Sequence, residues 1–372
     1  MRRALPALLA LVGFVLSGCD YGHLAAGQIK ILWRRQPLEQ ATRDPHLTTE
    51  ERALLGLVES VRRFAGELGL QVGDQYTSFV AWPGDRIVTT LVRTRPGSLE
   101  AVGWWYPFLG RLPYRGYFDQ MRAEREAQRL REEQGYDVCV SAVTAYSTLG
   151  WLDDPVTSPM LGRGAANLVE TLLHELVHAT VFIEGDADFN EGVALFIGQE
   201  AAIRYFARAA DPSHAEAPSD PLPSADRVRA WVGDRRRVEA AVLAFRDRLP
   251  RLASRPDAPS QRAAAERVLR GELAVLPLTV LQPAAVAADA RLSDACLALR
   301  GTYSRDLPRH EQLLAALGGD LDAMIHHLVE WAKRKESPDH FFADEAPRSD
   351  GQPAGLPADL AADLAAKRPR ED

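Results

Sequence analysis

Two histidines spaced four residues apart are the residues of this chain best suited to chemistry. They lie in the segment His174-Glu175-Leu176-Val177-His178. On a helix, residues four apart project about 40° from each other, so both imidazoles can bind one metal ion. Glu175 follows the first histidine, where a carboxylate can accept a proton from a water molecule at the metal. This spacing predicts a metal site with a general base beside it.

A third ligand is available a short distance downstream. Glu191 lies in the stretch 188–208, whose apolar residues recur with helical spacing. Two histidines and one carboxylate leave the fourth position of a tetrahedral metal open, as in catalytic zinc sites. We therefore expect His174, His178 and Glu191 to bind Zn²⁺, with Glu175 as the catalytic base.

The composition of the first helix favours this interpretation over its structural alternative, a surface helix with solvated histidines. Residues 168–182 read LVETLLHELVHATVF, which is apolar on nearly every face except at Glu170 and the motif residues. A helix of this kind is buried. Buried imidazoles and carboxylates need partners, and metal ligation supplies them.

Several separated segments resemble one known family. They are PYRGYF (113–118), AYSTLGWLDDPV (145–156), LLHELVHATVF (172–182) and GDADFNEGVALFIG (185–198). The chain resembles, over about residues 20–335, the bacterial predicted-aminopeptidase family of small, lipoprotein-like gluzincins. The resemblance implies a zincin-like fold and zinc peptidase chemistry, with His174, His178 and Glu191 as ligands and Glu175 as base.

Residues that would support the metal site are less clearly marked. Thermolysin-like enzymes place an aspartate four residues after the third ligand to orient a histidine, but here that position is Leu195. Asp186 and Asp188 are the candidates for this role, and the alternative is that they cap the second helix. A gluzincin also needs a hydrogen-bond donor to the oxyanion of the substrate.

We rank Tyr303 first as that donor, because GTYSRDLPRH (301–310) is a polar stretch that we expect between helices. Tyr205 and His310 are the alternatives. Most tyrosines instead pack in the core with a satisfied hydroxyl.

Two further segments have either a packing role or a role in the substrate cleft. The run 101–118 is rich in aromatic residues and is either core or one wall of the cleft, with Arg115 available for a substrate carboxylate. Tyr146, Ser147 and Thr148 offer hydroxyls that usually bond to nearby backbone. Their segment is also our candidate for aligning an extended substrate by strand addition.

The N-terminus reads as a targeting segment. Residues 1–18 combine Arg2 and Arg3 with a short apolar run, and Leu-Ser-Gly-Cys at 16–19 resembles a bacterial lipobox. We expect Cys19 to carry lipid after cleavage and to anchor the chain to the membrane, facing the periplasm. Asp20 resembles an inner-membrane retention signal. The alternative is an ordinary signal peptide with an incidental cysteine.

Composition excludes some classes of function. Among 372 residues, 46% are hydrophobic and 26% are charged, which is typical of a globular protein. The formal net charge of −7 argues against nucleic-acid binding, which favours a basic surface. Cys139 and Cys296 form no CxxC pair. They could bridge in an oxidising compartment, but we favour a buried free thiol for Cys139.

Periodicity predicts a mostly helical α+β protein with a small β element, organised as a peptidase domain over 19–343 and a disordered tail over 344–372. The expected helices span 21–36, 48–68, 118–133, 164–182, 188–208, 225–248, 258–275 and 309–335, and the expected strands 77–82, 87–93 and 137–143. An exposed loop is expected over 210–226. We expect three successive parts within the domain. A helical N-terminal part with the small β element extends to about residue 143, the catalytic helices span 164–208, and a C-terminal helical part spans 225–335.

These features predict a zinc-dependent peptidase of the cell envelope, with a peptide or protein substrate. The family resemblance favours an aminopeptidase. The alternatives are a zinc endopeptidase acting on envelope proteins and a noncatalytic metal-binding lipoprotein. An intact Glu175 argues against the noncatalytic alternative, because a scaffold needs the ligands but not the base. The sequence does not indicate an oligomeric state.

Overall fold

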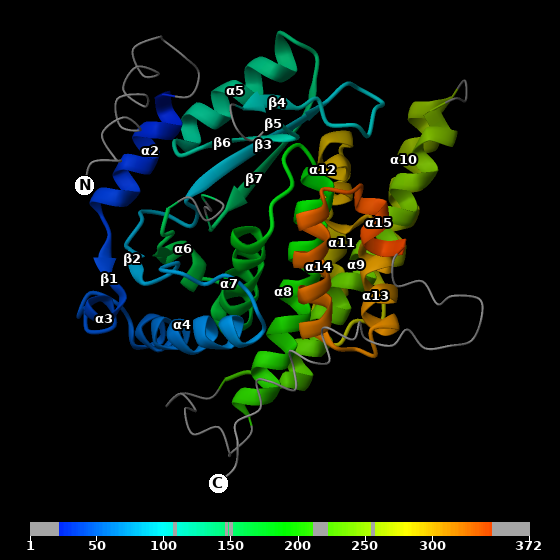
Figure 1. Ribbon diagram of the computed structural model, residues 1–372. Helices are drawn as coiled ribbons and strands as arrows, with labels where there is room; N and C mark the ends of the chain where they lie inside the picture. The colour runs from blue at the N-terminus through cyan, green and yellow to red at the C-terminus, as the bar shows by residue number, and fades with distance from the viewer. Residues whose placement is uncertain are drawn as a thin grey trace. The chain divides into compact units, whose positions relative to one another are not determined.

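A computed structural model describes residues 22–106, 110–145, 148, 152–210, 222–253 and 257–343 (Figure 1). The predicted signal segment 1–18, Cys19, Asp20 and the tail 344–372 lie outside the described residues. The chain forms two compact units, which divide after Leu307. The protein is mostly helical with small sheets, which confirms the predicted α+β class.

A three-stranded antiparallel sheet separates the core of the first unit into two sides. Strand β3 (Val88–Thr94) lies between β6 (Tyr114–Tyr117) and β7 (Asp137–Val143). On one side, α5 (Gln120–Glu132) buries Ala123, Ala127 and Leu130, which recur at helical spacing against the sheet. Because side chains alternate along each strand, the opposite side carries the other half of the strand residues.

The predicted helix pair forms next to that opposite side. Helix α7 (Gly164–Thr180) carries the HExxH segment, and α8 (Ala187–Ala209) carries Glu191. Gly198 brings the two helices together, since a Cβ there would lie 3.1 Å from the backbone nitrogen of His174. The first and last residues of α7 and α8 lie within a few residues of those predicted, which confirms these two helices. Helix α4 (Thr49–Glu67), which begins with a capping box at Thr48, packs against α7.

Four further helices of the described residues follow α8 in the first unit, and two of them were not predicted. They are α9 (Ala225–Ala253), α10 (Ala258–Ala274), α11 (Pro283–Asp289) and α12 (Asp294–Ser304). Helix α12 packs against α8, α9 and the sheet. The expectation that Tyr303 lies in a stretch between helices was wrong, because this residue belongs to α12. Its neighbours include several small residues that are buried on more than one side, so the segment lacks a clear helical period.

A disulfide joins α12 to the sheet. Cys139 of β7 and Cys296 of α12 are bonded, with their Cα atoms 5.0 Å apart. The expectation of a buried free thiol at Cys139 was therefore wrong. The two cysteines meet because α12 covers the side of β7 to which Cys139 points, and Val92 and Ala295 pack around them.

The described residues of the second unit form three short helices. They are α13 (Leu307–Ala316), which begins at the boundary, α14 (Leu321–Arg334) and α15 (Pro338–Ala343). The prediction of a single helix over 309–335 was wrong. Gly318 and Gly319 adopt φ of 69° and 80°, a left-handed conformation that ends α13 and that glycine adopts readily. Trp331 and Phe341 are buried in this unit.

The remaining elements are short apart from the N-terminal helix α2 (Gly22–Trp33), and they surround the core of the first unit. They are β1 (Gln36–Pro37), α3 (Leu38–Ala41), β2 (Ser78–Val80), β4 (Trp104–Tyr106), β5 (Gly110–Leu112), β8 (Val156–Thr157) and α6 (Ser158–Leu161). β2 pairs with β1 and β8, and β4 pairs with β5. None of the described helices has both the length and the apolar character needed to cross a membrane.

Candidate metal centre

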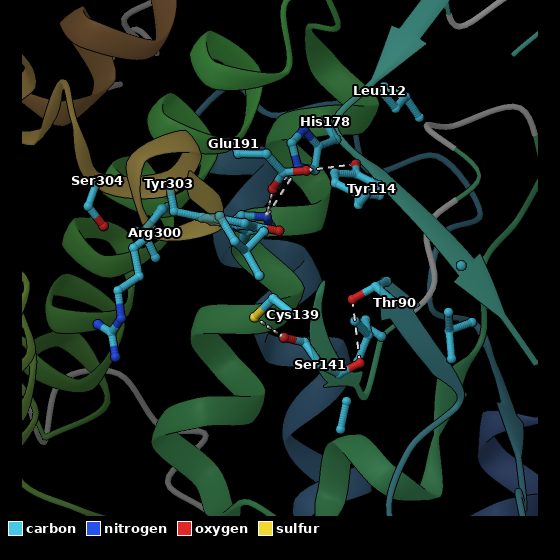
Figure 2. A pocket seen from close by; sticks show the side chains of 18 of the residues that line it. Thr90, Leu112, Tyr114, Cys139, Ser141, His178, Glu191, Arg300, Tyr303 and Ser304 are labelled. Atoms are coloured by element: carbon cyan, nitrogen blue, oxygen red, sulfur yellow. Dashed lines mark hydrogen bonds and ion pairs between the residues drawn. The ribbon is translucent and has the colours of Figure 1, made fainter. Parts of the chain in front are cut away.

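Three ligand atoms converge between α7 and α8. The Nε2 atoms of His174 and His178 lie 3.1 Å apart, and Glu191 Oε2 lies 3.5 Å and 3.6 Å from them. Figure 2 shows His178 and Glu191 directed toward the same point in the cavity. The two histidines come from successive turns of α7, and Glu191 comes from the second turn of α8.

These distances suit a metal ion. In a tetrahedral site with bonds of about 2.0–2.1 Å, neighbouring ligand atoms are about 3.3 Å apart. The three observed separations bracket this value. Two imidazole nitrogens and one carboxylate oxygen are also a ligand set that zinc prefers. The group formed by His174, His178 and Glu191 can therefore hold a metal ion.

Burial and charge keep Glu191 ionised. The side chain is buried, which by itself raises the pKa of a carboxyl group, but hydrogen bonding to His174 and His178 outweighs this effect and holds the pKa of Glu191 far below its usual range. Glu191 thus offers a carboxylate rather than a carboxyl group, which favours the binding of a divalent cation.

Two tyrosines lie next to the ligands. The Tyr114 hydroxyl donates to Glu191 Oε1 over 3.0 Å, which leaves Oε2 to face the histidines. The ring of Tyr303 stacks against that of His174, with centroids 6.4 Å apart. Burial first, and then the charge of Glu191, raise the pKa of both tyrosines well above 10. Both hydroxyls therefore keep their protons and can donate hydrogen bonds.

A cavity of about 660 Å³ adjoins the three ligands. It is bounded by α7, α8, α12 and the side of the sheet that carries Tyr114, Thr90 and Ser141 (Figure 2). Glu175 lines this cavity beside the ligands. The arrangement places a carboxylate, two hydroxyl donors and a candidate metal centre around one space large enough for a short peptide.

A family model described as "Putative aminopeptidase" matches residues 20–340. The chain belongs to this family. No match was found among curated proteins or among solved structures. The family points to peptide hydrolysis, and the cavity beside His174, His178 and Glu191 is the candidate site for such chemistry in this aminopeptidase-family chain.

The two aspartates considered as candidates to orient a histidine have other partners. Asp186 caps α8 by accepting from the Phe189 N–H, as the alternative interpretation held. Asp188 pairs with Arg305 over 3.1 Å. The sequence did not predict the contact from Tyr114 to Glu191. The two residues are far apart in the sequence, and only the pairing of β6 brings them together.

The other candidate donors have different surroundings. Tyr205 packs on Phe64, and its hydroxyl lies 2.6 Å from Ser60 Oγ, so this tyrosine joins α8 to α4. His310 belongs to the second unit, where it packs against Phe342.

The aromatic run 101–118 contributes to both the cavity and the core. Tyr106 and Tyr114 line the cavity, whereas Tyr117 packs on the α5 side of the sheet. Arg115, which the cleft alternative made available for a substrate carboxylate, is not among the residues that line this cavity. It neighbours Tyr114 on β6 and therefore points to the opposite side, where it stacks on Tyr117. Phe108 lies outside the described residues.

The loop before α7 is held by a buried aspartate. Thr148 donates its N–H to the Asp154 carboxylate, and its hydroxyl lies 2.9 Å from Asp154 Oδ1. The same hydroxyl also donates to the Leu152 carbonyl over 3.1 Å, as expected for a loop hydroxyl near backbone. Burial raises the pKa of Asp154 to about 7, against these hydrogen bonds. Tyr146 and Ser147, the other residues proposed for substrate alignment, lie outside the described residues.

Proposed function

We propose that this protein is a zinc-dependent peptidase with a zincin-like site, and that it acts as an aminopeptidase. The observation that carries the proposal is the convergence of His174, His178 and Glu191, at separations that fit a tetrahedral metal, with Glu175 beside them in a peptide-sized cavity. The family description supports peptide hydrolysis.

The three ligands would hold Zn²⁺ through Nε2 of each histidine and Oε2 of Glu191. When bound, zinc supplies Lewis-acid activation of water and of the substrate carbonyl. The Tyr114 hydroxyl fixes the rotamer of Glu191 by holding its second oxygen, so that Oε2 stays directed at the histidines.

Glu175 is the proposed general base. It follows His174 on α7 and lines the cavity, where it can accept a proton from the attacking water and transfer it to the leaving amine. Tyr303 is the proposed donor to the oxyanion of the tetrahedral intermediate, since its protonated hydroxyl lies in the same cavity.

Metal analysis and peptide hydrolysis test the proposal together. The purified chain from Asp20 onward should contain about one zinc per molecule, and Glu191→Ala should lose most of it. Glu175→Gln should keep the zinc and lose hydrolysis of a mixed peptide library by several orders of magnitude. Absence of zinc even after reconstitution would instead support the noncatalytic alternative, and an active Glu175→Gln would reject the base.

Peptides with free and acetylated N-termini separate the two peptidase alternatives. An aminopeptidase should cleave only the free peptide, because its site must recognise the amine. An endopeptidase should cleave both at similar rates. Cleavage products identified by mass spectrometry show directly whether one residue or a longer fragment is released.

We further propose that the protein is a lipid-anchored envelope protein, attached through Cys19 and facing the periplasm. The exposed apolar residues of α2, which begins three residues after Cys19, support this location. Trp33 is 88% exposed, Ile29 46% and Leu32 38%. These positions share one face of the helix and are suited to the boundary between headgroups and acyl chains.

A further inference from the structure

Four arginines line the cavity beside the metal centre, and three of them have an acidic partner. The pairs are Arg235–Glu170, Arg236–Glu200 and Arg300–Glu239. The fourth arginine is Arg291. Within the described part of the chain, its guanidinium meets no carboxylate and donates only to neutral acceptors. The cavity thus contains a cation that the fold does not neutralise.

Neutral contacts hold Arg291 against the edge of the sheet. It lies just before α12 and reaches β7, where Nη2 donates to the Val140 carbonyl and lies 3.1 Å from Cys139 Sγ. Nη1 lies 3.4 Å from Ser141 Oγ. These contacts fix the position of the guanidinium, and the residue as a whole remains exposed. A positioned and accessible arginine is well suited to bind a carboxylate.

The register of the sheet relates the strand position that holds this arginine to the position next to the metal centre. Tyr114, which contacts Glu191, pairs with Val92, and Val92 pairs with Cys139 on its other side. Adjacent strands lie about 4.8 Å apart, so about 10 Å separates the backbones at Tyr114 and Cys139. An extended peptide advances about 3.3 Å per residue. A carboxylate two or three residues from the scissile bond would therefore reach Arg291.

Arg291 also limits the free edge of β7, the outer strand of the sheet. The Val143 carbonyl accepts from Ile87, so the backbone of Val143 faces β3. By alternation, the backbone groups of Ala142 and Val140 face outward. A peptide extended along this edge could pair with Ala142, but at Val140 it would meet the guanidinium. A peptide that ends in a carboxylate fits this position, as does one that carries an acidic side chain there.

A second positive charge strengthens the preference for an anion. Burial lowers the pKa of Arg291, and the charge of Arg300 lowers it further, so the two guanidinium groups repel each other. Glu239 pairs with Arg300 and so offsets the charge of that arginine only. A carboxylate bound at Arg291 would balance the positive charge of Arg291.

We propose that Arg291 determines the specificity of the cleft by binding a peptide carboxylate two or three residues from the scissile bond. The carboxylate is either the C-terminus of a short peptide or an acidic side chain. This inference rests on the proposed peptidase function and adds a substrate class to it.

Matched tetrapeptides with free N-termini test the preference. One pair differs only in a C-terminal carboxylate or amide, and a second, amidated pair differs only in Glu or Gln at the third position. At least one carboxylate peptide should show kcat/KM roughly 10- to 100-fold above its neutral counterpart. The pair that shows the difference identifies the source of the carboxylate. Arg291→Gln should bring this ratio close to one, and Arg291→Lys should keep part of it.

A control variant and a binding measurement make the test decisive. Arg267→Gln makes the same charge change on the exposed surface of α10 and should leave the ratio unchanged. Calorimetric titration of zinc-loaded Glu175→Gln, with and without Arg291→Gln, measures peptide affinity without turnover. If wild type hydrolysed no peptide, the proposed function would fail, yet the affinities would still decide the role of Arg291. Equal discrimination with and without this arginine would show that it only tethers α12 to β7.

Discussion

Glu191 contacts both the histidines of α7 and a tyrosine of the sheet. One of its oxygens faces the histidines, and the other accepts from Tyr114. Tyr303 stands on the other side, against His174. The two tyrosines are alike in burial and in the direction of their pKa shifts. The roles proposed for them differ: Tyr114, on the sheet, would orient Glu191, and Tyr303, on α12, would donate to the oxyanion of the substrate.

Conservative substitutions should separate these roles. Tyr114→Phe removes the hydrogen bond that orients Glu191, so we expect zinc affinity to fall by about 10- to 100-fold. Tyr303→Phe should keep zinc and lower kcat by about 100- to 1,000-fold, because an oxyanion donor is lost. Competition with a chelator measures the first effect, and steady-state kinetics at saturating zinc measures the second. Full turnover by zinc-loaded Tyr303→Phe would contradict its assignment.

Asp154 should make stability depend on pH. Its pKa is about 7 in the folded protein, against 3.8 as the ordinary value, so the fold binds this proton more tightly than the unfolded chain does. The resulting stabilisation is complete below about pH 4 and is lost as pH rises toward 7. It amounts to about 4 kcal/mol. The free energy of unfolding of wild type minus that of Asp154→Asn, measured by denaturant titration, should fall over this range. A flat difference would contradict the shift.

At the scale of elements, the close approach of α7 and α8 sets the distance between ligands. Gly198→Ala would place a Cβ 3.1 Å from the His174 nitrogen and 3.2 Å from the Glu170 carbonyl, and neither backbone atom can yield alone. We expect a loss of about 1–3 kcal/mol of stability and weaker zinc binding. Gly271→Ala is the matched control, because nothing lies within 4 Å of a Cβ there. It should be neutral or stabilising by up to about 1 kcal/mol.

The disulfide fixes α12, and with it Tyr303, to the sheet. The bond joins residues separated by 157 positions, so it restricts the unfolded chain strongly. Replacing both Cys139 and Cys296 with Ala should lower the free energy of unfolding by about 2–5 kcal/mol. A reductant should lower the unfolding midpoint of wild type and leave that of the double variant unchanged. Equal sensitivity of the two proteins would mean that the bond does not stabilise the fold.

Local patterns predicted the elements that carry the candidate ligands. The strand over 137–143 has the expected bounds, and α7 and α8 follow from apolar residues at helical spacing. The spacing of His174 and His178 is also a local property. Contacts between segments that are distant in the sequence could not be predicted in this way. The hydrogen bond from Tyr114 requires the register of β6, and the disulfide requires α12, whose short and uniformly buried sequence gives no clear period.

At the scale of the whole molecule, the proposed attachment to a membrane has two parts. The lipid at Cys19 would be the main anchor, and apolar side chains at the boundary between headgroups and acyl chains would make a second contribution. Helix α2 can supply it through Ile29, Leu32 and Trp33, and it lies next to β6, where His23 stacks on Tyr117. The sheet edge that carries Tyr114 would then face a defined direction relative to the membrane.

Fractionation and vesicle binding test the two parts separately. Cys19→Ala should release soluble protein from the membrane fraction, and continued membrane association would contradict the lipid anchor. In this unlipidated background, Trp33→Ser should weaken binding to phospholipid vesicles by at least several-fold, because the most exposed apolar side chain of α2 is lost. Val275→Ser is the control, since Val275 is 79% exposed at the end of α10. If both variants bound vesicles equally, α2 would not be the second contact, and Cys19 would have to act alone.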